Sequence, residues 1–228
     1  MDMKGKIIVT GGSHGVGLAT IQLLNEKGYI AINLDLAGDP SIDVTNHQQV
    51  KQYLSAHDDS IGLICCASLA NSALIENMDM KIANEVIQTN LFGALNSVNS
   101  VFKDFKESSE PRSIVLLSSI WALTGQPGLT AFSASQFGLR GLAQSLHMEG
   151  LSHNVFTTAL CMTYVSTNKM KVIPDEIKDK MIASECPTGK MLTPEEAAHW
   201  LVYTTEQQLE GKPMDDFTHR SLRHPKQL

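Results

Sequence analysis

Short apolar runs alternate with helical stretches along most of this chain, and this alternation constrains the fold more than any other feature of the sequence. Apolar runs of this length predict buried strands, and strands that alternate with helices are joined by crossovers that lay them parallel. Helices then cover both faces of the sheet. We therefore predict an α/β fold with a doubly wound, mostly parallel sheet of six strands, and leave a seventh near residues 211–216 open. The six predicted strands cover residues 7–10, 30–36, 41–44, 61–66, 113–117 and 156–161.

Composition and charge exclude several classes of protein. Hydrophobic residues make up 43% of the 228 residues and charged residues 18%, which excludes a disordered chain. The net charge of −6 argues against nucleic acid or an anionic membrane surface as the main partner. No apolar run approaches the roughly 18 residues that a membrane span needs. The four irregularly spaced cysteines are interpreted as reduced thiols, so we expect a cytoplasmic protein.

The chain is predicted to form one domain over residues 1–206, followed by a polar tail over residues 207–228. Within the domain, two helix starts carry a capping box, in which a hydroxyl residue is followed three positions later by Gln or Glu. These starts are Thr45 and Thr193. The tail is either a solvated segment or a basic docking segment, and the sequence leaves both interpretations open.

A glycine-rich turn with the sequence Thr-Gly-Gly-Ser-His-Gly-Val-Gly follows the first predicted strand and opens a helix. The glycines let the backbone approach a pyrophosphate, and the helix N-terminus supplies N–H donors and partial positive charge. Asp35 stands 18 residues beyond Gly17, where a carboxylate accepts hydrogen bonds from an adenosine ribose and repels a 2′-phosphate. The sequence thus predicts NAD in preference to NADP, and the alternative is a turn that binds nothing. The predicted cofactor-binding residues of this segment are Thr10, Gly11, Ser13, His14, Gly15, Val16, Gly17 and Asp35.

With this turn the chain resembles the short-chain dehydrogenase/reductase family over residues 5–206, because the family's turn reads T-G-x-x-x-G-x-G. The resemblance implies a Rossmann-type fold that binds a nicotinamide dinucleotide. It also implies that Asp43 and Val44 contact the adenine, that Ala67 lies beside the cofactor, and that Thr167 meets the nicotinamide amide.

The same resemblance locates the reaction centre. Asn90 resembles the asparagine that positions the family's catalytic lysine through water, and Ser119 resembles the catalytic serine. The family's Y-x-x-x-K pair supplies a tyrosine acid and a lysine that lowers the tyrosine pKa and holds the nicotinamide ribose. Here the pair falls on Phe132 and Gln136, and a Ser-Ala-Ser interior preserves the frame. Phe has no proton to donate and Gln has no charge, so the family's mechanism is predicted to be disabled. The alternative is that another group took over the acid role, and Tyr164 is the best candidate for it.

Two functions follow from this pattern. We favour a regulatory or scaffolding protein on an oxidoreductase fold, in which Gln136 still contributes to binding NAD(H). The alternative is an unusual oxidoreductase, or a lyase-type enzyme, that acts on a carbonyl or alcohol substrate. No metal site is predicted, because the adjacent Cys65 and Cys66 point to opposite faces of a strand.

The predicted helices over residues 81–105 and 131–150 resemble the two helices through which members of this family pair. Both carry apolar residues on more than one face, and a helix that is apolar beyond one stripe needs a second partner. We therefore expect a homodimer, and leave open a hetero-oligomer with an active relative. The apolar residues in question are Val86, Leu91, Leu95, Val98, Phe137, Leu139, Leu142 and Leu146.

Overall fold

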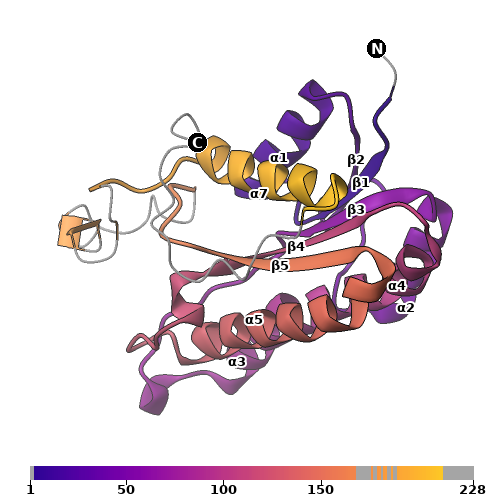
Figure 1. Cartoon of the computed structure of the whole chain (residues 1–228). Coiled ribbons are helices and arrows are strands. Elements are labelled where there is room, and N and C mark those ends of the chain that lie inside the picture. Colours follow the sequence, from indigo (N-terminus) through magenta and orange to yellow (C-terminus); the bar gives the residue numbers. More distant parts are fainter. Residues whose placement is uncertain are drawn as a thin grey trace.

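A computed structural model describes residues 3–167 and 189–212, together with residues 176, 179, 180, 182, 183 and 186 between them. Its centre is a single sheet of five parallel strands in the order β2-β1-β3-β4-β5 (Figure 1). The predicted doubly wound α/β architecture is therefore confirmed, with five strands among these residues instead of six. The strands are β1 (Lys6–Thr10), β2 (Ile30–Leu34), β3 (Ser60–Cys65), β4 (Arg112–Ser119) and β5 (Val155–Met162).

The prediction of a third strand over residues 41–44 is wrong. Ile42 and Val44 are buried at 5% and 6% exposure, so the apolar alternation that suggested a strand is real. The backbone instead turns at Val44 and Thr45, where the Asp43 carboxylate accepts hydrogen bonds from both the N–H and the hydroxyl of Thr45. Of the open seventh strand, only residues 211 and 212 are described, and they are not in a strand.

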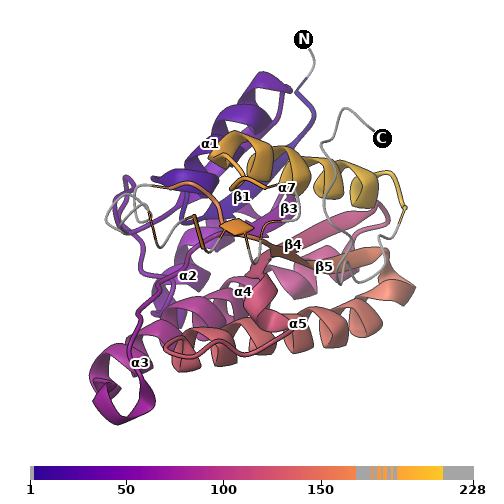
Figure 2. The same cartoon turned by 90° about the vertical axis from the view of Figure 1, so that its left-hand side faces the viewer.

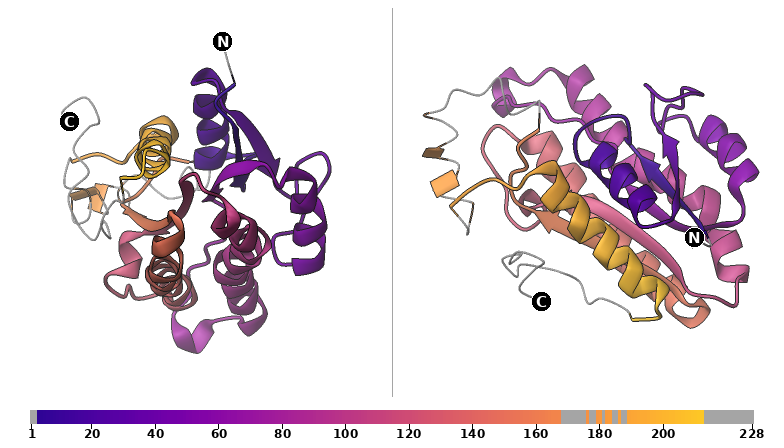
Figure 3. Two further views of the ribbon diagram at one scale, coloured as in Figure 1. Left: turned by 45° about the vertical axis from the view of Figure 1, so that its right-hand side comes forward. Right: turned by 90° about the horizontal axis from the view of Figure 1, so that it is seen from above.

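Helices form one layer on each face of the sheet (Figures 1 and 3). On one face, α1 (Gly15–Glu26) lies beside α7 (Pro194–Leu209), and both pack on a core that includes Ile7, Val9 and Leu160. On the other face lie α2 (His47–Leu54), α4 (Gly93–Glu107) and α5 (Thr130–Gly150). Figure 2 shows α3 (Met80–Ile87) below α4 and beside α5, on the far side of the sheet from α1.

The helix boundaries test the capping predictions. At Thr193 the capping box is present, because its hydroxyl accepts from Glu196 N while the Glu196 carboxylate accepts from Thr193 N. At Thr45 the prediction is wrong by one position, because Asn46 caps α2 by accepting from Gln49 N. Two adjacent residues could each cap this helix, and Thr45 is held instead by Asp43.

The predicted helix over residues 131–150 is confirmed as α5, but the one over residues 81–105 is interrupted. Residues 88–92 form a π-helical turn between α3 and α4, and Asn90 lies in it. Such turns are rare and occur frequently at functional sites.

The strand order places a topological switch point at β1. From β1 the chain crosses first to β2 on one side and then to β3 on the other, so the connections diverge at the carboxyl ends of β1 and β3. Ligands of open α/β sheets bind at such a crevice. The glycine-rich turn after β1 and the segment that begins at Cys66 after β3 both lie there.

Candidate cofactor and active site

The turn after β1 is fixed to the neighbouring strand β3. Thr10 ends β1, and its Oγ1 accepts hydrogen bonds from the backbone N–H groups of Cys66 and Ala67 at 3.1 and 3.2 Å. Gly11 follows with φ of +69°, and a Cβ there would lie 2.7 Å from the Cα and N of Ala67. Glycine is the residue that allows this approach, so the predicted residues Thr10, Gly11 and Ala67 come together at the switch point.

The N-terminus of α1 rests on the same turn. A Cβ on Gly17 would overlap the carbonyl oxygen of Gly11, so the third glycine of the motif brings the helix close to the turn. His14 precedes the helix, and its exposed side chain makes no capping hydrogen bond. The first N–H groups of a helix have no partner within it, so an uncapped first turn such as the one that begins at Gly15 has the geometry to receive an anion. A dinucleotide pyrophosphate fits this arrangement.

Asp35 follows β2 and lies against the glycine-rich turn, as the sequence predicts. Its Oδ2 accepts from Ser13 N at 3.3 Å, and its Oδ1 accepts from Ala37 N at 2.8 Å. Asn33, two residues earlier, donates from Nδ2 to the Ser13 hydroxyl at 3.1 Å. The half-buried carboxylate therefore stands at the edge of the turn.

Asp43 and Val44 lie near this end of the sheet but are engaged by the protein itself. The Asp43 carboxylate holds the turn at Thr45. The Val44 side chain is buried, and a Cβ on Gly93 would lie 2.7 Å from its Cγ2. Val44 thus packs its side chain against the start of α4 and not toward an open surface.

Asn90 joins three separate segments of the chain. It is 1% exposed, and its Nδ2 donates to the Leu69 carbonyl at 2.9 Å and to the Ser135 hydroxyl at 3.0 Å. Its Oδ1 accepts from Leu69 N at 2.6 Å. The side chain therefore ties the loop after β3 to α5. The sequence singled out Asn90 but missed Leu69 and Ser135, since hydrogen bonds across 21 and 45 positions leave no local pattern.

The predicted reaction centre lies where β4 ends against α5. Ser119 is the last residue of β4, and its Oγ accepts from Trp121 N at 3.3 Å. The neighbouring Ser118 hydroxyl donates to the Gln136 carbonyl at 3.4 Å. Gln136 is 2% exposed and Phe132 is half-buried one turn earlier on the same helix. An apolar ring and a neutral amide thus lie on one helix beside the end of β4, at the two positions that the resemblance assigns to an acid and a lysine.

The segment after β5 lies across the glycine-rich turn. The Thr167 Cγ2 atom lies 3.3 Å from the place that a Cβ on Gly15 would take, so the predicted nicotinamide-contacting residue borders the turn. The Tyr164 ring packs edge-on against Trp121 with ring centroids 6.2 Å apart. Tyr164 therefore lies near the segment that follows Ser119, and a substitute acid would have to lie there.

The adjacent thiols of Cys65 and Cys66 stand where β3 ends, in surroundings that favour their protonated form. Burial raises the pKa of the Cys65 thiol to about 12, and it also raises the pKa of Cys66. A protonated thiol is neither a nucleophile nor a good metal ligand. Among the residues that the structure describes, no three Cys, His, Asp or Glu side chains gather as a metal site would need.

The fold and the site define a class of protein, the dinucleotide-binding α/β proteins with a glycine-rich turn at the switch point of a parallel sheet. Comparison with protein families then identifies the family. The sequence model of short chain dehydrogenases matches residues 39–178, which is more than half of the chain. The chain belongs to the short-chain dehydrogenase family, which the glycine-rich turn and the residues around Ser119 and Gln136 also indicate.

Individual relatives cover nearly the whole chain. An acetoacetyl-CoA reductase of Rhizobium meliloti is 28% identical over 88% of this chain and 90% of its own. A 3-oxoacyl-(acyl-carrier-protein) reductase of Thermotoga maritima is 27% identical over 89% of this chain and 91% of its own. The structure of an aldohexose dehydrogenase of Thermoplasma acidophilum shares the fold, with a TM-score of 0.80 at 23% identity over 90% of this chain and 89% of its own. Within the described part of the chain, the helices are too short or too polar to cross a bilayer.

Proposed function

We propose that this chain binds a nicotinamide dinucleotide, with NAD(H) preferred over NADP(H), and that it does not carry out the tyrosine- and lysine-dependent reaction of its family. One observation carries the proposal. Phe132 and the buried, neutral Gln136 occupy the two acid-base positions of a frame that is otherwise formed. The function that this combination supports is regulatory or scaffolding, with the dinucleotide as ligand.

The residues that would hold the dinucleotide are arranged in the order of its parts. The turn from Gly11 to Gly17 and the uncapped end of α1 receive the pyrophosphate, and Asp35 accepts hydrogen bonds from the adenosine ribose. Thr167 borders the turn on the side of the nicotinamide. When bound, the dinucleotide supplies a hydride donor or acceptor; the chain's own residues then determine whether a proton can follow.

Proton transfer is the step that this chain lacks. A positioned general acid contributes typically about 10²- to 10⁴-fold to rate. Phe132 offers no proton, and Gln136 offers no charge that would lower the pKa of a neighbouring group. The Ser119 hydroxyl can hydrogen-bond a carbonyl oxygen but cannot release a proton to it at neutral pH. The frame therefore orients a ligand without protonating it.

A second candidate is an oxidoreductase that acts on a carbonyl or alcohol with Tyr164 as its acid. The relatives favour this candidate over the first, because two of them are named as reductases of acetoacetyl-CoA and of 3-oxoacyl-(acyl-carrier-protein). The edge-on contact between Tyr164 and Trp121 places the phenol near the segment that follows Ser119. A lyase-type reaction at the same residues is part of this second candidate, because such a reaction also needs a proton donor.

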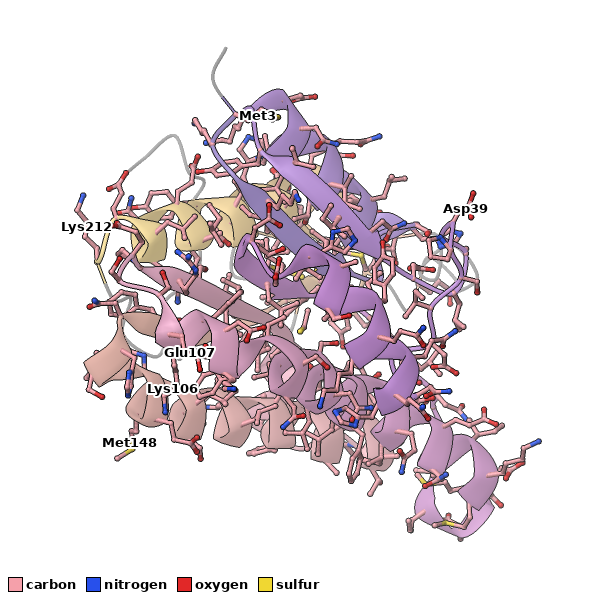
Figure 4. All side chains as sticks on the ribbon, turned by 90° about the vertical axis from the view of Figure 1, so that its right-hand side faces the viewer. Met3, Asp39, Lys106, Glu107, Met148 and Lys212 are labelled. Atoms are coloured by element: carbon pink, nitrogen blue, oxygen red, sulfur yellow. The ribbon has the colours of Figure 1, made fainter. Side chains whose placement is uncertain are left out.

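Calorimetric titration with NADH and NADPH tests the binding proposal. We expect wild type to bind NADH more tightly, and Asp35→Arg to reverse the preference. Asp39→Arg is the matched control, since Asp39 is an exposed residue at the outer margin of the molecule (Figure 4) and the same change of charge there should leave the preference intact. If neither dinucleotide binds at about millimolar concentration, the glycine-rich turn has no ligand of this class and the proposal fails.

Turnover separates the two candidates. We expect wild type to reduce a panel of diketones, quinones and 3-oxoacyl thioesters with NADH at no more than background rate. Measurable reduction that Tyr164→Phe abolishes, with NADH affinity unchanged, would establish the second candidate and overturn the first.

We also propose that the chain pairs as a homodimer through α4 and α5. Three large apolar side chains are exposed by about two fifths here: Leu95 of α4, Phe137 of α5, and Phe92 in the π-helical turn directly before α4. Of the apolar residues that the sequence pointed to, Leu95 and Phe137 are thus open, while Val98 and Leu139 are used in the core. A hetero-oligomer with an active relative would use the same surface.

A further inference from the structure

A corner of uncharged polar side chains lies between the loop after β3, the end of β4 and α5. Ser135 is fully buried and donates to the Phe132 carbonyl at 2.7 Å, while its hydroxyl oxygen accepts from Asn90 at 3.0 Å and from Gln136 Nε2 at 3.5 Å. Ser118 donates to the Gln136 carbonyl. Every member of this hydrogen-bonded corner is neutral. Its members are Asn90, Ser118, Ser135 and Gln136.

The position of this corner indicates which part of a dinucleotide would meet it. Asp35, the residue that we propose holds the adenosine ribose, follows β2 on one side of the switch point. The rest of an extended dinucleotide must then cross the glycine-rich turn toward β3 and β4, whose carboxyl ends hold the corner. This step depends on the proposed binding function. It places the nicotinamide end on the side of Gln136, the corner residue that stands at the family's lysine position.

The two redox forms of the dinucleotide differ in charge at this end, since the oxidised nicotinamide ring is a cation and the reduced ring is neutral. A buried ammonium at position 136 would repel the oxidised ring, because charges in a partly buried site interact far more strongly than in water. A neutral amide imposes no such penalty.

We propose that Gln136 determines which redox form of the dinucleotide this chain accepts: with a neutral side chain at this position, NAD+ binds about as tightly as NADH, whereas a cation here would select the reduced form. The chain then stays loaded with dinucleotide in either redox state. That behaviour suits a binding or scaffolding role. A reductase must instead release its oxidised cofactor after each turnover.

Dissociation constants for NAD+, NADH and ADP-ribose, measured by calorimetry, test this inference. We expect the NAD+ and NADH constants of wild type to agree within about threefold. Gln136→Lys should weaken NAD+ relative to NADH by about tenfold or more, and Gln136→Glu should shift the ratio in the opposite direction. Gln136→Met is the neutral control and should leave the ratio as in wild type. ADP-ribose lacks the ring, so it reports effects on the rest of the site.

The wild-type ratio requires no variant, so the inference can be overturned even if a charge at this buried position prevents folding. A wild-type preference for NADH of tenfold or more contradicts it. So does a ratio that Gln136→Lys and Gln136→Glu leave unchanged while circular dichroism shows that both fold. If ADP-ribose and both dinucleotides fail to bind, the proposed function falls together with this inference; if they bind with an insensitive ratio, only the inference falls.

Discussion

Four glycine-to-alanine variants separate the physical demands that the glycine-rich turn makes on the chain. Gly141, in α5, has a helical backbone and no atom within 4 Å of an added Cβ. Gly28 has the same open space but a φ of +87°. Gly11 combines a φ of +69° with a Cβ position 2.7 Å from Ala67 backbone atoms, and Gly17 combines a helical backbone with overlap on the Gly11 carbonyl. The four variants therefore separate the cost of a left-handed backbone from the cost of a close contact at the added Cβ.

The expected changes in the free energy of unfolding follow from these differences. Gly141→Ala should stabilise the chain by about 1 kcal/mol, because alanine favours the helix. Gly28→Ala should destabilise it by about 1–2 kcal/mol through the left-handed backbone alone. Gly11→Ala adds overpacking of about 1–3 kcal/mol against a backbone that cannot yield, which gives a total of about 2–5 kcal/mol. For Gly17→Ala, overpacking of about 3 kcal/mol opposes a helical gain of about 1 kcal/mol, which leaves a loss of about 2 kcal/mol.

Urea unfolding followed by circular dichroism measures the series, and NADH titration of the same variants measures its effect on the site. We expect Gly11→Ala and Gly17→Ala to lose dinucleotide binding, while Gly28→Ala and Gly141→Ala retain it. If Gly11→Ala unfolds no more readily than Gly28→Ala, the close approach of the turn to Ala67 is refuted. The pyrophosphate cradle that we propose at the switch point would then have no geometric basis.

Three further predictions follow from the site and its surroundings. Asn90→Ala should lower the free energy of unfolding by about 2–4 kcal/mol, since it removes three hydrogen bonds of a buried side chain, two partly buried ones to Leu69 and a buried one to Ser135. Asn99→Ala, which removes an exposed contact with His47, should cost less than about 0.5 kcal/mol in the same urea assay. Burial raises the pKa of the Cys65 thiol from about 9 to about 12, so the contribution of the protonated thiol to stability is present below pH 9 and is lost as the pH rises toward 12. Iodoacetamide at pH 8 should therefore leave Cys65 unmodified until urea unfolds the chain. Rapid labelling of the native protein would show instead that the thiol is accessible. Light scattering should give a dimer at micromolar concentration that Phe137→Glu weakens and Met3→Glu does not, because Met3 is exposed at the other end of the molecule from α5 (Figure 4); a monomeric wild type would rule out the proposed pairing.

The sequence was sufficient where the determining interactions are local or periodic. Alternating apolar runs predicted a parallel sheet covered on both faces, and the spacing from Gly17 to Asp35 predicted a carboxylate beside the turn, where it contacts Ser13 N. The start of α7 could be predicted because a capping box involves residues only three positions apart, Thr193 and Glu196.

The sequence was insufficient where distant partners decide the conformation. Residues 41–44 have the alternation of a strand, but the Asp43 carboxylate turns the backbone toward Thr45. The π-helical turn at Asn90 is held by Leu69 and Ser135, which lie far away along the chain, and no periodic pattern records such contacts. The unexpected substitutions Phe132 and Gln136 were visible in the sequence, but their burial and neighbours were not.

The most direct test of the account is the rate of NADH-dependent carbonyl reduction by wild type and by the double variant Phe132→Tyr, Gln136→Lys. We predict background turnover for wild type, little gain from Phe132→Tyr because an unassisted phenol has a pKa near 10, and no gain from Gln136→Lys without a proton donor. The double variant should gain more than the product of the single effects, because the two residues act as one unit. Wild-type turnover at ordinary enzymatic rates, about 1–10³ per second, would contradict the claim that this chain binds the dinucleotide without the chemistry of its family.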